Sequence, residues 1–72
     1  MMVNIGDLVE FKHGYTTSIG KVKDILEIKA SIDRKRIGNK IYNVEMDMGG
    51  DISGTLQLNE NDILSRFVKT EL

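Results

Sequence analysis

Apolar and polar side chains alternate along residues 41–48 and again along residues 52–58. The alternate positions that carry apolar residues or glycine are Tyr42, Val44, Met46 and Met48 in the first run, and Ile52, Gly54, Leu56 and Leu58 in the second. Successive side chains of a β-strand point to opposite faces, so each run is typical of a strand with one buried and one solvated face. The Gly49-Gly50-Asp51 segment can adopt the positive φ angles of a tight reversal. The pattern predicts a β-hairpin over residues 40–58, around which the chain is organised.

Two more strands are expected before this hairpin. In residues 8–12, Val9 and Phe11 share the parity that should face the core. In residues 19–28 the alternation slips, and a bulge or sharp bend near Asp24 would explain the slip. A helix over residues 21–30 is the alternative, but that segment has no convincing N-cap and no clean apolar stripe. The polar segment of residues 13–18 contains a glycine and is interpreted as a loop.

A turn and a closing strand are expected after the hairpin. Asn59-Glu60-Asn61-Asp62 is rich in residues that cap turns, which favours a single 3-10 turn. Residues 64–69 would form the last strand, with either Phe67 or the Leu64/Val68 pair turned inward. A helix over residues 56–67 is the weaker alternative, because the polar segment interrupts its apolar side.

The most polar part of the chain, residues 29–39, connects the second strand to the central hairpin. Its sequence is Lys-Ala-Ser-Ile-Asp-Arg-Lys-Arg-Ile-Gly-Asn, and it has no strong period. We interpret it as a long exposed connection, the extended tip of a hairpin being one form it could take. Long connections inside compact domains are often either functional or disordered.

The length of 72 residues corresponds to one domain, covering residues 1–72. The chain has no cysteine, so neither a disulfide nor a thiolate metal site can stabilise it. No signal peptide and no apolar run of membrane-spanning length is recognisable, so we expect a soluble, cytoplasmic protein without a membrane partner. β-Branched residues are common, which favours strands over helices.

Charge is distributed unevenly although the net charge is only −1. Residues 21–40 contain seven basic and three acidic side chains, a balance of +4, whereas residues 43–72 contain six acidic and two basic ones, a balance of −4. This asymmetry is the main electrostatic feature of the sequence.

Several short motifs together resemble the SH3-like small β-barrels, the broad family that includes Tudor and KOW modules. They are Gly6-Asp7-Leu8-Val9-Glu10-Phe11, Gly20-Lys21-Val22, Tyr42 and Val44 with Asp47, and Asn59-Glu60-Asn61-Asp62-Ile63-Leu64. Gly20-Lys21-Val22 resembles the centre of a KOW motif, but the glycine-rich basic part before it is absent. The resemblance covers about residues 5–69 and implies an all-β fold: one SH3-like barrel of about five antiparallel strands with a 3-10 turn before the last. A fold of this kind hosts many functions.

The candidate binding residues are mostly basic. Arg34, Lys35 and Arg36 with Lys40 form the densest cluster, and Lys21 and Lys23 precede it. These charges could steer an acidic protein surface, or they could release counterions from nucleic acid. They could also simply keep a loop solvated. Tyr15 lies in the segment that partner-binding SH3-like barrels often use, where an exposed aromatic ring could cover an apolar residue of a partner or stack on a base.

Catalysis is not expected from this sequence. Glu45 and Asp47 lie on the polar parity of the hairpin, but nothing supplies further metal ligands at loop spacing. His13 is isolated, and the serines lack a nucleophile motif. We therefore expect a non-catalytic module, without cofactor or metal, that binds a protein partner through its loops and an open sheet edge. That edge could also form a homodimer. The alternative is a nucleic-acid-binding accessory module that uses the basic 34–40 loop.

Overall fold

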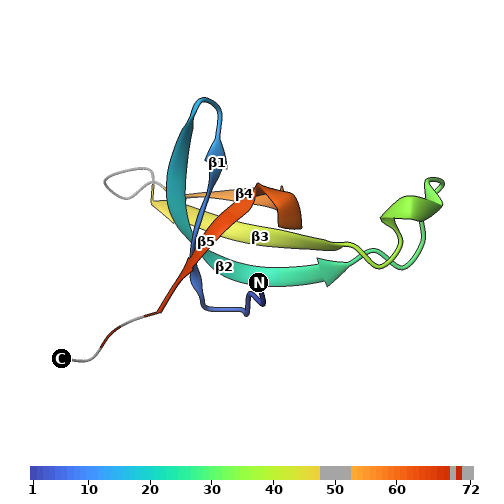
Figure 1. Ribbon diagram of the computed structural model, residues 1–72, viewed down its shortest axis with the longest axis horizontal. Coiled ribbons are helices and arrows are strands. Elements are labelled where there is room, and N and C mark those ends of the chain that lie inside the picture. The colour runs from blue at the N-terminus through green and yellow to red at the C-terminus, as the bar shows by residue number, and fades with distance from the viewer. Residues whose placement is uncertain (48–52, 69, 71–72) are drawn as a thin grey trace.

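The fold is a single curved sheet of five antiparallel strands. The computed structural model describes residues 1–47, 53–68 and 70. The strands are β1 (Leu8–His13), β2 (Thr16–Glu27), β3 (Lys40–Asp47), β4 (Ser53–Asn59) and β5 (Ile63–Phe67), and their order in the sheet is β4-β3-β2-β1-β5. Two single 3-10 turns, η1 (Arg34–Arg36) and η2 (Glu60–Asp62), lie between β2 and β3 and between β4 and β5. Figure 1 shows the arrangement.

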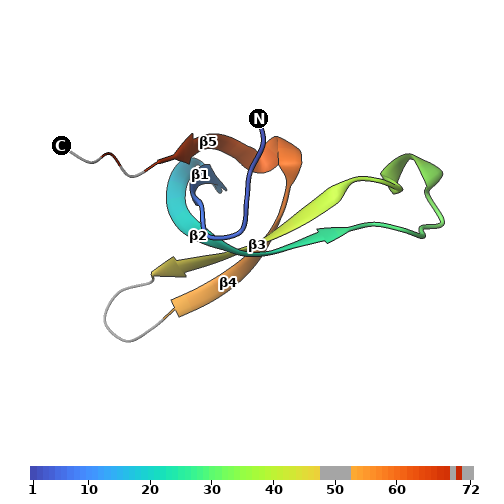
Figure 2. The same cartoon turned by 90° about the horizontal axis from the view of Figure 1, so that it is seen from below.

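The strand β2 connects the two halves of the sheet. Its first half pairs with β1, and its second half pairs with β3. The register with β3 shifts between Val22 and Asp24, which confirms the predicted bulge and the preference for a strand over a helix. Bulges increase the bend and twist of a strand, and β2 curves around the body as it passes from one partner to the other (Figure 2).

The core lies on the inner face of this curved sheet. Its buried side chains are Val3, Val9, Phe11, Val22, Tyr42, Val44, Met46, Leu58 and Ile63. Gly20 allows β2 to pack closely against β3. A Cβ atom at this position would lie 2.5 Å from Val44 Cγ1 and 2.8 Å from the carbonyl oxygen of Glu45. The N-terminal segment covers part of the core through Val3, for which the sequence pattern gives no signal.

The central hairpin is confirmed in the part of it that the structure describes. Tyr42 pairs with Leu58, and Val44 pairs with Leu56, so the apolar parities of β3 and β4 share one face. The predicted reversal at residues 49–51 and the predicted inward position of Met48 lie outside the described residues. The 3-10 turn predicted at residues 59–62 is confirmed as η2, where the carboxylate of Asp62 accepts a hydrogen bond of 3.1 Å from the backbone N–H of Asn59.

The predicted loop over residues 13–18 is wrong. Thr16 and Thr17 pair with His13 and Lys12 in the β1–β2 ladder, so only two residues make the turn. Gly14 has a φ of +65°, a conformation that glycine adopts without steric cost. The threonines are β-branched and fit the pleated ladder well, which outweighs the polar character of the segment.

The inward residue predicted for the last strand is also wrong. Ile63 faces the core with 6% exposure, whereas Leu64, Phe67 and Val68 are 43%, 42% and 70% exposed. The register between β1 and β5 shifts next to Phe11, so that Phe11 pairs with Ile63 while Glu10 pairs with Ser65. A shift of one residue exchanges the two faces of a strand, and the sequence of β5 alone does not reveal it.

The all-β class and the antiparallel arrangement are confirmed. The strands β4 and β5 stand at opposite ends of the sheet order and are not hydrogen-bonded neighbours. Strand pairing in the described residues therefore gives an open sheet, and closure into a barrel remains a prediction.

Asp7 connects the N-terminal segment to β5. Its Oδ2 atom accepts hydrogen bonds from the backbone N–H of Asn4 at 2.8 Å and from Arg66 Nε at 2.7 Å. The bond from Asn4, together with the charge and hydrogen bond of Arg66, holds the pKa of Asp7 below its usual value of 3.8. A carboxyl whose pKa is lowered by folding stabilises the protein above its unfolded pKa, and this contribution is lost as the pH falls through the folded pKa.

We therefore expect the free energy of unfolding to fall between about pH 5 and about pH 2, and Asp7→Asn to make this fall shallower. Urea denaturation followed by circular dichroism at several pH values in this window measures both slopes. The matched control is Asp24→Asn, which removes an exposed carboxyl on β2. An Asp7→Asn profile as steep as that of the unsubstituted chain would contradict the assignment.

Candidate partner-binding arm

The clearest projection from the body is a two-stranded ribbon formed by the end of β2 and the start of β3. We call residues 26–41 the arm. Leu26 pairs with Ile41, and beyond them the backbone N–H groups of Ile28 and Gly38 donate to Asn39 and Ile28 at 2.9 and 2.8 Å. Figure 1 shows the arm extending away from the other strands along the longest axis of the molecule. The exposed connection predicted over residues 29–39 is thus the extended tip of a hairpin, which the sequence analysis left as one of its possible forms.

Local hydrogen bonds define the tip of the arm. The carboxylate of Asp33 caps η1 by accepting from the backbone N–H of Lys35 at 3.0 Å. The N–H of Arg36 donates to the carbonyl of Asp33, and the N–H of Ile37 donates to that of Arg34. Gly38 then has a φ of +90°, which turns the chain back into β3. The carboxylate of Asp33 is therefore engaged with the backbone of η1.

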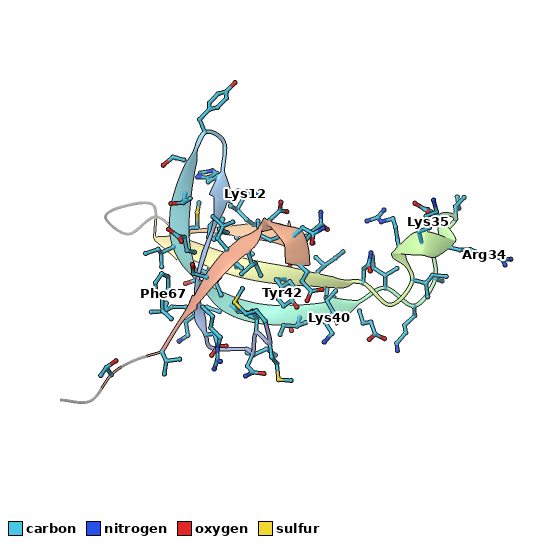
Figure 3. The ribbon with its side chains drawn as sticks, in the orientation of Figure 1. Lys12, Arg34, Lys35, Lys40, Tyr42 and Phe67 are labelled. Atoms are coloured by element: carbon cyan, nitrogen blue, oxygen red, sulfur yellow. The ribbon has the colours of Figure 1, made fainter. Side chains whose placement is uncertain are left out.

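Four of the five basic residues of the arm, Arg34, Lys35, Arg36 and Lys40, are exposed and have no salt-bridge partner in the described part of the chain. Arg34 and Lys35 project at the tip, and Lys40 lies nearer the body (Figure 3). The salt bridges formed by other cations are Lys23–Glu45, Lys29–Glu27 and Arg66–Asp7. The tip of the arm therefore presents Arg34, Lys35 and Arg36 without a salt bridge that a negatively charged surface would have to break.

Apolar side chains lie among these cations. Leu26, Ile32 and Ile37 are 47%, 106% and 46% exposed, and η1 contains no buried residue. An isolated two-stranded ribbon is only marginally stable in water. Exposed apolar groups rimmed by charges are typical of surfaces that contact another protein. Sequence reasoning emphasised the cations and missed this feature, although isoleucines within so polar a segment were a visible signal.

The other predicted binding residues are not brought to the arm. Tyr15 lies in the β1–β2 turn and is fully exposed, and this turn and the arm are at separate extremities of the molecule (Figure 1). Lys21 and Lys23 are exposed on β2 within the body, where Lys23 Nζ lies 3.8 Å from Glu45 Oε2. The predicted set therefore divides into three places, and only Arg34, Lys35, Arg36 and Lys40 belong to one continuous element.

A polar hollow lies between the base of the arm and η2. It has a volume of about 530 Å³ and is lined by Arg36, Asn39, Lys40, Asn59, Glu60, Asn61 and Asp62. A second hollow of about 330 Å³ lies beside it, lined by Met1, Met2, Val3, Lys40, Tyr42 and Glu60. Lys40 and Glu60 border both hollows. Burial and the nearby carboxylate of Glu60 raise the pKa of Tyr42, so its hydroxyl stays neutral at physiological pH.

Groups with catalytic or metal-binding chemistry do not converge within the described residues. His13 Nδ1 lies 3.2 Å from Ser18 Oγ in an exposed position, but no carboxylate is found hydrogen-bonded to that imidazole in the part of the chain described. No cluster of three metal-ligating side chains is present among these residues. The side chain of Asp47, which the sequence pairs with Glu45, lies outside them. Each described helical segment is a single 3-10 turn, too short to cross a bilayer.

Comparisons with known proteins give no family for this chain. No family model, no curated protein and no solved structure matches it.

Proposed function

We propose that this chain is a small SH3-like β-barrel module that binds a protein with an acidic surface and catalyses no reaction. The strand order β4-β3-β2-β1-β5 and the 3-10 turn before the last strand support the fold assignment. The motifs that resemble SH3-like barrels fall at β1, β2, β3 and η2, in the order that the resemblance implies. Loops and an open sheet edge are the parts of such a module that remain available to partners.

The composition of the arm favours a protein partner. The arm combines four cations that form no salt bridge in the described part of the chain with exposed Leu26, Ile32 and Ile37. An acidic protein surface can satisfy the cations and cover the apolar groups in one interface, in which apolar anchors supply affinity and charges supply orientation and on-rate. Nucleic-acid phosphates would satisfy the cations only. The isoleucines would remain in water, and no aromatic residue on the arm offers a platform for base stacking.

Nucleic-acid binding is the second candidate, because Arg34, Lys35 and Arg36 have no salt-bridge partner in the described part of the chain. Phosphate contacts by such residues are strongly salt-dependent. The two candidates differ in what the isoleucines contribute. An apolar-to-polar change at Ile32 should weaken a protein interface and leave phosphate contacts nearly unchanged.

The experiment compares two probes: an amphipathic acidic peptide of alternating glutamate and leucine, and a random DNA duplex. We expect the peptide to bind, with Ile32→Ser and the triple change of Arg34, Lys35 and Arg36 to serine each weakening its binding about tenfold. Isothermal titration calorimetry at two salt concentrations measures the affinities. The matched control is Ile19→Ser, which changes an exposed isoleucine on β2.

Two results would decide against a protein partner. One is duplex binding that weakens steeply with salt, is abolished by the triple change and is unaffected by Ile32→Ser. The other is peptide binding that Ile19→Ser weakens as much as Ile32→Ser does. A peptide in which serine replaces every leucine separates the contribution of charge from that of apolar contact.

A further inference from the structure

The polar hollow at the base of the arm has charges of both signs in its lining. Arg36 and Lys40 come from the arm, and Glu60 and Asp62 come from η2. None of these four side chains takes part in a salt bridge of the described residues, although all of them line the same space. The cations and the carboxylates therefore do not neutralise each other directly, and a molecule placed between them can contact both.

The rest of this hollow is lined by asparagines. The amides of Asn39, Asn59 and Asn61 can each donate and accept hydrogen bonds. The Oδ2 atom of Asp62 accepts from the backbone N–H of Asn59, which fixes this carboxylate and leaves its Oδ1 atom for another donor. The volume of about 530 Å³ falls within the range of about 300–1,000 Å³ that is typical of small-molecule sites. The hollow can therefore hold a small polar molecule.

The second hollow adds an apolar wall. Met1, Met2 and Val3 line it from the N-terminal segment, and it shares Lys40 and Glu60 with the polar hollow. The two hollows therefore adjoin at one cation and one carboxylate. A ligand that fits both of them carries its charges at this junction and an apolar part beside the methionines.

Tyr42 provides an independent indication of a ligand. It is 2% exposed, yet it lines the second hollow beside Lys40 (Figure 3). Buried tyrosine hydroxyls usually have a hydrogen-bond partner, but none of the side-chain hydrogen bonds formed among the described residues involves this hydroxyl. Glu60 borders both hollows, and its charge contributes to the raised pKa of Tyr42. The hydroxyl is thus available to a molecule at the junction.

We propose that the two hollows together bind a small zwitterion with an apolar side chain, of which an α-amino acid such as leucine is the simplest form. Its carboxylate faces Lys40 and the hydroxyl of Tyr42, its ammonium group faces Glu60, and its side chain lies against the N-terminal segment. A ligand with only a negative charge would meet the carboxylates of η2, and a ligand with only a positive charge would meet the cations of the arm. A molecule with both charges satisfies both walls.

The affinity is expected to be modest, and each charged group of the ligand should contribute a small part of it. Arg36, Lys40 and Glu60 are exposed, and ion pairs between exposed groups contribute little because water screens them. Removing either charge from the ligand should therefore weaken binding about two- to fivefold. Selectivity comes from the requirement for three different groups in one molecule.

The test is a titration of the full chain with leucine, followed through backbone amide chemical shifts. Leucine should shift the amides of η2, of the start of β3 and of the N-terminal segment in a saturable manner. N-acetylleucine lacks the ammonium group and leucinamide lacks the carboxylate, so each should bind about two- to fivefold more weakly than leucine. Glycine lacks the apolar side chain and should also bind more weakly.

The source of the zwitterion is distinguished by a second probe. The dipeptide Leu-Leu carries the same three kinds of group with its charges further apart. Tighter binding of leucine would identify a free amino acid as the ligand, and tighter binding of Leu-Leu would identify a short peptide. Either order of affinity agrees with the proposed chemistry.

Tyr42→Phe is the most informative variant, because it removes the hydroxyl and keeps the ring in the core. It should weaken leucine binding about threefold or more. The free energy of unfolding should stay nearly unchanged, since the hydroxyl has no hydrogen bond to lose within the part of the chain that is described. The matched control is Tyr15→Phe, which removes a hydroxyl from the β1–β2 turn and should bind leucine like the unsubstituted chain.

Glu60→Gln tests the same junction from the exposed turn η2, where a substitution does not disturb the core. It should weaken leucine binding about two- to fivefold, and its matched control is Asp24→Asn on β2. Absence of saturable shifts up to the solubility limit of leucine would overturn the inference. Equal affinities for leucine, N-acetylleucine and leucinamide would also overturn it, as would unchanged leucine affinity in both Tyr42→Phe and Glu60→Gln.

This inference goes beyond the proposed function and does not depend on it. Glu60→Gln and Tyr42→Phe leave the arm intact, so both variants should bind the acidic peptide like the unsubstituted chain. Ile32→Ser changes the arm far from the hollows and should leave leucine binding unchanged. Leucine binding without peptide binding overturns only the role of the arm, and peptide binding without leucine binding overturns only the zwitterion site.

Discussion

Phe11→Ala is expected to remove most of the stability of this domain. Phe11 is fully buried and lies at the centre of the core, and truncating a buried phenylalanine costs about 3–5 kcal/mol through lost transfer free energy and the cavity that remains. Typical stabilities of about 0.05–0.15 kcal/mol per residue give a chain of 72 residues only about 4–11 kcal/mol in total. Urea denaturation followed by far-ultraviolet circular dichroism should show a large fall in the midpoint.

The matched control is Phe67→Ala, which removes the same side chain from β5. Phe67 is 42% exposed, so its truncation loses less buried area and leaves no enclosed cavity. We expect a cost of about 1 kcal/mol. Equal costs for the two substitutions would place Phe67 in the core and contradict the assignment of Ile63 as the inward residue of β5.

This pair of phenylalanines illustrates how far sequence reasoning could reach. Phe11 was predicted to face the core because it alternates with Val9 along β1. The pairing of β1 with β2 preserves this alternation. The inward residue of β5 was missed because a register shift next to Phe11 selects it. Such a shift depends on how two strands meet whose paired residues lie 52 to 59 positions apart in sequence, and no local pattern in either strand encodes it. The bulge in β2 was predictable because it interrupts the alternation of that strand itself.

The candidate binding site, too, was predictable from the sequence only in part. The basic cluster was visible in the sequence as a charge asymmetry, and its place on an exposed connection was expected, with a hairpin tip as one possible form. The separation of Tyr15 from the arm depends on the directions in which two hairpins leave the curved sheet (Figure 1), which spacing along the chain does not specify. The exposure of Ile32 and Ile37 agrees with the expected exposed connection, but the sequence analysis assigned these two apolar side chains no part in binding.

Excision of the outer part of the arm, residues 29–38, should abolish peptide binding while preserving the fold. Replacing residues 29–38 by Asn-Gly would join Ile28 to Asn39 through a two-residue turn of the kind that fits antiparallel strands. The replaced segment contributes no side chain to the core, and shortening a loop changes its closure entropy only slightly. We therefore expect the free energy of unfolding to change by about 1 kcal/mol or less, and the affinity for the acidic peptide to fall below detection.

A second variant separates the shape of the arm from its chemistry. Changing Ile32, Arg34, Lys35 and Arg36 together to serine keeps the length of the arm and removes the exposed side chains that we assign to binding. Asp33 and Gly38 are retained in this variant, so that the cap and the positive φ angle of the tip remain. It should bind the peptide as poorly as the excised chain does, and amide chemical shifts outside the arm should stay unchanged. Full peptide affinity in either variant would show that the binding surface lies on another element. The β1–β2 turn with Tyr15 would be the first element to test. Loss of the folded body on excision would instead make the arm a structural part of the domain.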